Sequence, residues 1–341
     1  MHCFVDDPIA SLRGTRLQRR LYVTMIVLVW EALNFTLAYR KGQFGPYVVW
    51  IGGELAFTES GVTGQIKQSI VEDIVEALHK FRNENVHSCK ELRSFVGRAN
   101  YAAGLLVAVR PFLHALWGAL STQSSGPQNT VWAKQVSHAM SWLRAFFCDA
   151  ELSTQRHFSL EEFRATGPRL EIGTDASPWG LGGWLAIDGT ITHYFSTPVS
   201  LHDLDIFKIE RGSCDGQQTL ESLAILVALR AWTDKHSSRK FRLQVRGDNV
   251  GALSLVLKMR PGSPQQALIA REIALEVVHF AFPPSVTHTP GVAHVIADGL
   301  SRLDDPNYVK KDVLLHPALK NATCTSVPIR PKAWYKTLEE R

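Results

Sequence analysis

Apolar residues recur every three or four positions through much of the first 150 residues, a spacing that predicts amphipathic helices. The clearest stripe consists of Ile66, Ile70, Ile74 and Leu78. Ser88 and Glu91 have the spacing of a capping box, so a helix is expected to begin beside Ser88. In all, this part of the chain predicts two short strands over 2–13, a hairpin over 46–57 turning at Gly52-Gly53, and helices over 16–36, within 64–121 and over 131–148.

The pattern changes after Gly167-Pro168, which we take as a domain boundary. Short apolar strands now alternate with helices, and Asp188-Gly189 is typical of a two-residue hairpin turn. This order predicts an α/β domain over 168–303, followed by a tail over 304–341 that we expect to be extended or loosely ordered. The expected strands are 170–175, 180–187, 190–196, 241–246 and 285–289, and the expected helices are 219–235, 249–259, 263–281 and 292–303.

Composition excludes some classes of protein. The 341 residues are 45% hydrophobic and 20% charged, as in globular proteins. The longest apolar run is much shorter than the ~20 residues that a membrane helix needs, so no membrane association is expected. Five isolated cysteines favour neither disulfides nor a cysteine zinc site and suit a reducing, intracellular compartment, whether cytoplasm or nucleus. The net charge of +5 permits nucleic-acid binding without requiring it.

Four acidic residues in the second half stand at the ends of predicted elements. Asp175 ends the first predicted strand and Asp248 the fourth, while Glu221 and Asp298 lie on predicted helices. If the two strands are neighbours, their carboxylates lie side by side at one sheet edge. Clustered carboxylates need a counter-charge because each raises the pKa of the next. Two Mg²⁺ ions, with Mn²⁺ as an alternative, would supply it and suit phosphodiester hydrolysis. Taken singly, each acid also fits a turn or a helix cap.

The acids stand in the segments Gly173-Thr174-Asp175-Ala176-Ser177-Pro178-Trp179-Gly180, Thr219-Leu220-Glu221-Ser222, Gly247-Asp248-Asn249 and Ala297-Asp298-Gly299-Leu300-Ser301-Arg302. In this order, the segments resemble the RNase H domain of retroelement reverse transcriptases. The resemblance implies Mg²⁺-dependent cleavage of the RNA strand of an RNA–DNA hybrid. It also implies an RNase H-like mixed five-stranded sheet flanked by helices, with Asp175, Glu221, Asp248 and Asp298 as catalytic metal ligands.

Other residues receive roles from the same resemblance. His288 and His294 lie in the loop where the family places a histidine that shuttles a proton or releases product, and His294 replaces a common Asn. Each also fits an ordinary surface-loop histidine. Asn249, Ser177 and Arg302 are expected to contact nucleic acid, although Asn249 fits a helix cap equally well.

The N-terminal half resembles the preceding part of the same enzymes. Phe4-Val5-Asp6-Asp7 is similar to the palm motif that holds metals at the polymerase site, and Lys41 falls within the sequence that follows it. We therefore expect a truncated palm hairpin over 1–57 and a mostly helical thumb or connection region over 58–150. The resemblance places the fingers and another metal-binding Asp upstream. The chain is then a fragment, with Asp6, Asp7 and Lys41 as remnants of a polymerase site, and polymerase activity is not expected.

Three functions stay open at this point. The first is a hybrid-specific ribonuclease within a retrotransposon polyprotein, with RNA–DNA hybrid and the missing N-terminal half as partners. The second is an inactive nucleic-acid-binding remnant of a degenerate element. The third is a transposase or exonuclease with the same fold.

Overall fold

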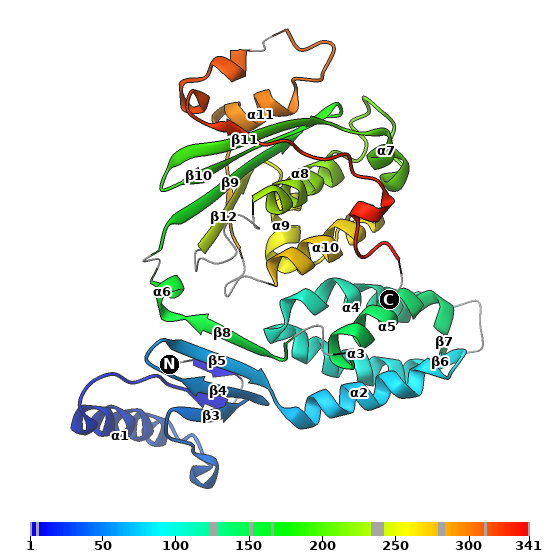
Figure 1. The fold of residues 1–341 in the computed structure, drawn as a ribbon. Coiled ribbons are helices and arrows are strands. Elements are labelled where there is room, and N and C mark those ends of the chain that lie inside the picture. The colour runs from blue at the N-terminus through cyan, green and yellow to red at the C-terminus, as the bar shows by residue number, and fades with distance from the viewer. Residues whose placement is uncertain are drawn as a thin grey trace.

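The computed structural model describes residues 2–4, 7–122, 129–149, 153–164, 167–232, 242–278, 284–309 and 312–339. These residues form one six-stranded sheet, one four-stranded sheet and two two-stranded sheets, together with helices. Figure 1 shows the six-stranded sheet at one end of the molecule, and the four-stranded sheet with a group of helices at the other. The predicted α/β class is therefore confirmed.

The N-terminal strands and hairpin follow the predicted order. The hairpin turns at Ile51-Gly52, one residue earlier than expected, and both residues have positive φ, 43° and 78°. Strands β1 and β2 pair antiparallel, and β3, β4, β5 and β8 form the four-stranded sheet in that order. The bounds are β1 (His2–Phe4), β2 (Asp7–Ile9), β3 (Tyr47–Trp50), β4 (Gly53–Phe57), β5 (Gly61–Ile66) and β8 (Gln155–Ser159).

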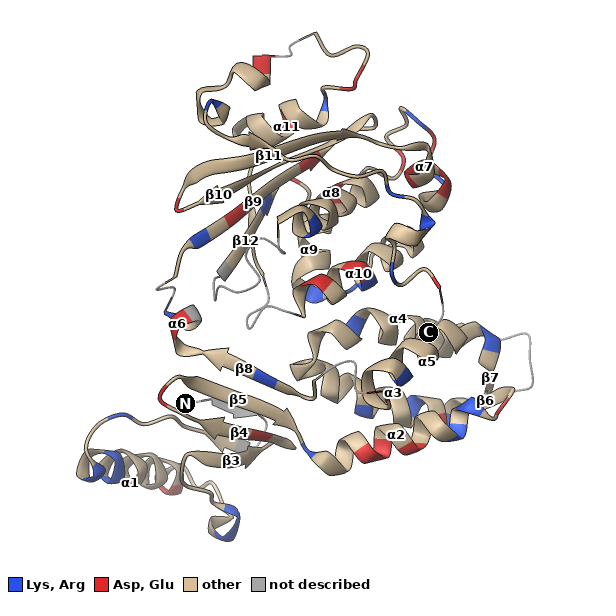
Figure 2. Ribbon diagram, in the orientation of Figure 1, with Lys and Arg blue, Asp and Glu red and all other residues tan. Residues whose placement is uncertain are grey.

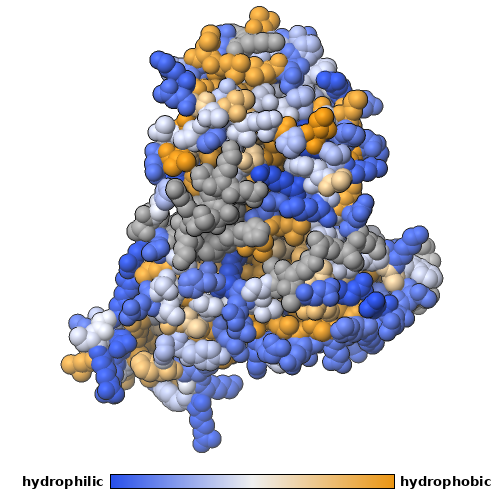
Figure 3. All heavy atoms as spheres, viewed as in Figure 1, coloured by the Kyte–Doolittle hydropathy of each residue, from blue (hydrophilic) through white to orange (hydrophobic). Residues whose placement is uncertain are grey.

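Helix α1 (Arg16–Ala32) confirms the helix predicted over 16–36. It begins with a capping box in which the Thr15 side chain accepts from Gln18 N and the Gln18 side chain accepts from Thr15 N. None of its residues is buried, and Leu17 and Leu28 are 78% and 61% exposed. Hydrophobic and hydrophilic side chains accordingly lie next to each other at the position of α1 in Figure 3.

The helical region has its own hydrophobic core, which includes Leu92, Phe112 and Trp142. Ile66 belongs to strand β5 rather than to the helix whose stripe was expected to contain it. The capping box at Ser88 is also wrong, because Ser88 makes no side-chain cap and Glu91 pairs with Lys80 at 2.6 Å. The elements here are α2 (Gln68–Arg82), β6 (Val86–Ser88), α3 (Cys89–Leu105), α4 (Arg110–Ser121), β7 (Thr130–Trp132) and α5 (Ala133–Phe147).

The large sheet has the strand order β13-β12-β9-β10-β11-β14. Strands β9, β10 and β11 form an antiparallel meander, and β12 runs parallel to both β9 and β13. The five predicted strands are present, but a sixth, β14, joins β11 from the tail and corrects the five-stranded expectation. The bounds are β9 (Arg169–Ala176), β10 (Gly180–Ile187), β11 (Thr190–Pro198), β12 (Arg242–Gly247), β13 (Ser285–His288) and β14 (Thr323–Cys324).

Helices cover both faces of this sheet. Helix α8 packs on β9 and β10, α9 packs on β12 and β13, and α10 packs on α8. Helix α11 packs on β9 and β10 from the other face (Figure 1). Every residue of α8 from Thr219 to Leu229 is buried, so α8 is a core helix rather than an amphipathic surface helix. The bounds are α6 (Leu160–Phe163), α7 (Leu201–Phe207), α8 (Gln217–Trp232), α9 (Val250–Lys258), α10 (Pro264–Val277) and α11 (Val295–Ser301).

The tail packs against both the large-sheet region and the helical region, whereas it was expected to be extended or loosely ordered. Arg330 and Asp203 of α7 form an ion pair at 2.6 Å, with side chains 1% and 0% exposed. Further on, Trp142 of α5 donates through its ring nitrogen to the Glu339 carbonyl. In Figure 1 this segment, drawn in red, runs past α7 and α10 to the helical region. No helix in the described part of the chain combines the length and apolar character of a membrane span.

Candidate metal centre

Two strands bring Asp175 and Asp248 to the same level of the sheet. Strands β9 and β12 are parallel neighbours, and their register pairs Gly173 with Arg246. Asp175 and Asp248 each stand two residues beyond that pair, at the carboxyl ends of the strands. The two strands are therefore neighbours, as the expected proximity of the Asp175 and Asp248 carboxylates required.

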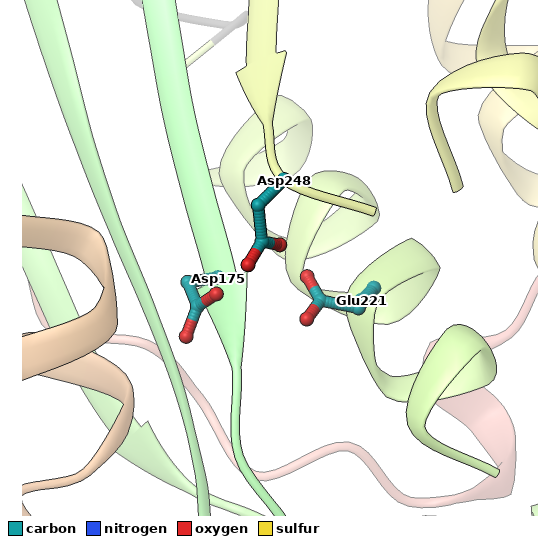
Figure 4. Close-up of side chains that lie close together, drawn as sticks. All are labelled: Asp175, Glu221 and Asp248. Carbon is teal, nitrogen blue, oxygen red and sulfur yellow. The ribbon is translucent and has the colours of Figure 1, made fainter. Parts of the chain in front are cut away.

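Helix α8 adds the third carboxylate. Glu221 lies in its second turn, and the helix is held against β9 by its apolar residues, such as Leu220 and Leu223. One carboxylate oxygen from each of Asp175, Glu221 and Asp248 can be chosen so that all three lie within 4.8 Å of one another. Figure 4 shows the three side chains, from β9, α8 and the end of β12, converging on a common space.

The environment of these acids penalises negative charge. The pKa of Asp175 is raised from 3.8 to about 7, first by burial and then by the carboxylates of Asp248 and Asp298, against an opposing hydrogen bond from Ser301. Burial, and then the charges of Asp175 and Asp248, raise the pKa of Glu221 well above its ordinary value. Without a cation, the cluster is therefore expected to hold extra protons near neutral pH.

The side-chain hydrogen bonds to the buried acids come from neutral groups. Ser301 Oγ donates to Asp175 Oδ2 at 2.6 Å, and Gln217 Nε2 donates to Glu221 Oε1 at 3.0 Å. Among the residues that the structure describes, none of the three clustered carboxylates forms a salt bridge. Three oxygen donors with uncompensated charge fit hard divalent cations such as Mg²⁺.

Asp298 lies beside this cluster rather than inside it. It occupies the first turn of α11, and Arg302 Nε donates to its Oδ1 at 2.7 Å. Its charge contributes to the raised pKa of Asp175, and Ser301 Oγ lies within hydrogen-bond distance of both Asp175 Oδ2 and the Asp298 carbonyl oxygen. Of the four predicted metal ligands, the fold thus brings three together and places the fourth next to them, paired with an arginine.

The two predicted histidines occupy different environments. His294 is only 3% exposed, and its Nε2 donates to the Thr174 carbonyl at 2.8 Å, next to Asp175. The surface-loop alternative is therefore wrong for His294, which holds the backbone beside Asp175. His288 is exposed, and its Nε2 lies 3.1 Å from the Asp248 carbonyl oxygen.

The three residues expected to contact nucleic acid also differ in their environments. Ser177 is 1% exposed, and its hydroxyl accepts from Gly180 N and donates to the Ser301 carbonyl, so its prediction as a nucleic-acid contact is wrong. Asn249 caps α9 by accepting from Ala252 N at 3.0 Å, as the plainer alternative expected. Arg302 keeps 42% of its side chain exposed while it pairs with Asp298.

The predicted polymerase remnant lies in a different part of the molecule. Asp6 is outside the described residues, and the Asp7 backbone belongs to β2, where Asp7 pairs with Phe4. Lys41 is exposed on a short 3-10 helix, Tyr39–Lys41. The acidic cluster on the large sheet consists of Asp175, Glu221 and Asp248, which come from other elements.

Ser301 and Gln217 are contacts that the sequence analysis did not single out. Ser301 follows Asp298 by three residues and Gln217 precedes Glu221 by four, so each shares a helix face with a predicted ligand. That spacing is a signal that points to a residue beside a known acid. It does not show which partner the hydroxyl or amide reaches.

Comparison with known proteins gives matches among solved structures. Neither a protein-family model nor a curated protein matches this chain. The ribonuclease H1 isolated from compost by a metagenomic approach is 18% identical, with a TM-score of 0.31, over 39% of this chain and 91% of its own. The ribonuclease H1 of the archaeon Halobacterium salinarum is 21% identical, with a TM-score of 0.28, over 39% of this chain and 93% of its own. The foamy viral protease-reverse transcriptase, solved in complex with an RNA/DNA hybrid, is 15% identical, with a TM-score of 0.29, over 80% of this chain and 33% of its own.

Proposed function

We propose that the chain is a divalent-metal-dependent endonuclease that cleaves the RNA strand of RNA–DNA hybrids, within a retroelement reverse transcriptase. The observation that carries the proposal is the convergence of Asp175, Glu221 and Asp248 from β9, α8 and β12. Residues far apart in the chain supply these carboxylates, and two of them are buried at an energetic cost. A cation site explains why the fold accepts that cost.

The chain's own residues hold and orient the proposed ions. Asp175, Glu221 and Asp248 are the proposed ligands, and Asp298, whose charge acts on Asp175, is the proposed fourth. When bound, Mg²⁺ would supply an activated water nucleophile and would neutralise charge at the scissile phosphate. Gln217 orients the Glu221 carboxylate, and His294 holds the Thr174 carbonyl, which fixes the strand end that carries Asp175.

Recognition of the hybrid is assigned to groups that remain accessible at this edge. His288 is the last residue of β13, Asn249 lies just beyond the carboxyl end of β12, and Arg302 follows α11. We infer that they meet the nucleic-acid backbone, since contacts to phosphates and sugars position a duplex without reading its sequence. Selection of the RNA strand would then depend on its 2′-hydroxyl groups.

The proposed retroelement origin is supported by sequence motifs alone. These motifs lie in the predicted palm region, 1–57, and the predicted connection region, 58–150.

The test is cleavage of an end-labelled RNA–DNA hybrid by the full chain in Mg²⁺, beside single-stranded RNA and duplex DNA. Asp248→Asn removes one ligand charge and keeps the side-chain shape, so the rate should fall by more than about 100-fold, because such a ligand contributes several kcal/mol to transition-state stabilisation. Asp205→Asn is the matched control, because Asp205 is exposed on α7 and pairs with Lys208.

The outcome separates the candidate functions. Cleavage confined to the RNA strand of the hybrid, abolished by EDTA and by Asp248→Asn but not by Asp205→Asn, supports the proposal. Cleavage of duplex DNA would instead favour a transposase or exonuclease. Hybrid binding without cleavage by a folded chain would favour an inactive remnant.

A further inference from the structure

Helix α11 makes an unusually close approach to strand β10. A Cβ atom at Gly182 would lie 2.4 Å from Ser301 N, and one at Gly180 would lie 2.6 Å from Ser301 O. Real side chains do not tolerate such distances, so glycine at both positions is what allows the contact. The last turn of α11 therefore rests directly on the strand backbone.

Hydroxyl groups from two other elements hold the same turn. Ser196 Oγ of β11 donates to the Leu300 carbonyl at 2.8 Å. Ser177 Oγ, in the turn between β9 and β10, donates to the Ser301 carbonyl at 2.7 Å. These two bonds place the Ser301 backbone without using the Ser301 side chain.

The Ser301 side chain is turned toward the acidic cluster. Its hydroxyl is fully buried and lies 2.6 Å from Asp175 Oδ2 and 2.9 Å from the Asp298 carbonyl oxygen. A hydroxyl has one hydrogen, and an ionised carboxylate is the stronger acceptor. Figure 4 shows one carboxylate oxygen of Asp175 on the side of Glu221 and the other turned away from it.

We propose that Ser301 is a positioning residue that locks the Asp175 carboxylate in the orientation needed to bind the divalent cation. The proposal rests on the function proposed above and names a residue that acts through Asp175. Engaging Oδ2 in a buried hydrogen bond restricts rotation of the carboxylate and leaves the other oxygen free for the cation. Loss of such a supporting contact typically weakens metal binding by 10–100-fold.

The test compares three variants of the full chain by the Mg²⁺ concentration that gives half of the metal-induced rise in unfolding temperature. Ser301→Ala removes the hydroxyl that reaches Asp175. Ser196→Ala is the matched control, because it removes one anchor of the same helix turn and touches no carboxylate. Ser301→Thr retains a hydroxyl at the position and serves as the conservative variant.

We expect Ser301→Ala to raise the Mg²⁺ midpoint by about 10–100-fold, while Ser196→Ala and Ser301→Thr stay near the wild-type midpoint. Hybrid cleavage by Ser301→Ala should recover as Mg²⁺ is raised, which a general loss of folding would not produce. Equal midpoints for Ser301→Ala and Ser196→Ala would overturn this proposal and leave the proposed function intact. A wild-type chain whose unfolding temperature does not respond to Mg²⁺ or Mn²⁺ would overturn both.

Discussion

Buried carboxylates give the proposed site its chemistry and make it costly to fold. Asp175 and Glu221 are 3% and 5% exposed, and their nearest side-chain donors, Ser301 and Gln217, are neutral. Burial without an opposite charge disfavours the ionised form of each acid. The metal-free protein should consequently be most stable where these acids are protonated.

This cost leads to a prediction about pH. Because the pKa of Asp175 is about 7 in the folded chain and 3.8 ordinarily, the folded state holds an additional proton between these values. The stability of the metal-free chain should therefore fall as pH rises through this window, by up to about 4 kcal/mol at about 1.4 kcal/mol per pKa unit. Urea unfolding at pH 5 and pH 8 in EDTA measures the part of this change that lies above pH 5, about 3 kcal/mol at the same slope.

Two comparisons make that experiment specific. Mg²⁺ should restore stability at pH 8 more than at pH 5, since ionised carboxylates bind the cation. Asp175→Asn should flatten the pH dependence in EDTA and should be more stable than the wild type at pH 8. A wild-type chain with the same stability at both pH values would contradict the assigned environment of Asp175.

The contact between α11 and β10 is the element-level feature on which the site depends. Helix α11 carries both Asp298 and Ser301, and it contacts both β10 and β9. A helix this short has little stability of its own and depends on packing. Its placement is therefore sensitive to the size of the residue beneath it.

Gly182→Ala tests this dependence. The added methyl group would lie 2.4 Å from Ser301 N and 2.7 Å from Ala297 O, so the helix or the strand must move. We expect a loss of about 1–3 kcal/mol in unfolding free energy and a marked loss of hybrid cleavage. Urea unfolding and the cleavage assay measure the two effects.

Gly97→Ala is the matched control for this substitution. Gly97 lies exposed in α3, and a Cβ atom there would meet no atom within 4 Å beyond its chain neighbours and the nearby backbone of its own helix. Alanine should stabilise that helix by roughly 0.5–1 kcal/mol without changing cleavage. If Gly182→Ala behaved in the same way, the tight helix–strand contact would be refuted.

The C-terminal segment connects the large parts of the whole molecule. Arg330 pairs with Asp203, and Glu272 of α10 accepts from Thr337 N; acidic bands on α10 are drawn in Figure 2. The chain then continues to α5, where His138 Nε2 lies 2.8 Å from the Thr337 carbonyl oxygen. The segment thus ties the helical region to the large-sheet region through buried polar contacts.

Arg330→Met should destabilise the molecule strongly. The change leaves Asp203 buried without its charge partner, which typically costs about 3–5 kcal/mol. Adding Asp203→Asn should recover part of the loss, because no uncompensated buried charge remains. Lys80→Met, at the exposed pair with Glu91, should leave the urea midpoint nearly unchanged. Equal midpoints for Arg330→Met and Lys80→Met would show that the buried pair does not hold the tail.

Local patterns predicted most of the elements and the main acids of the candidate site. The strands at 180–187 and 285–289 and the turn at Asp188-Gly189 follow from short-range alternation and turn chemistry. Asp175 and Asp248 were expected to lie together on the condition that their strands are neighbours, and the pairing of β9 with β12 meets that condition. Helix α7 was missed, although Ser200 and Asp203 form a capping box.

Contacts between residues that are distant in the sequence could not be predicted from these local patterns. The hydroxyl of Ser301 meets Asp175 across 126 positions, and His294 meets Thr174 across 120. Arg330 and Asp203 are separated by 127 positions, and their pairing converts an expected loose tail into a packed one. Apolar periodicity and helix caps involve residues a few positions apart, so they can be predicted from short stretches of sequence. Which buried groups meet depends on how the elements pack, and that is decided when the whole chain folds.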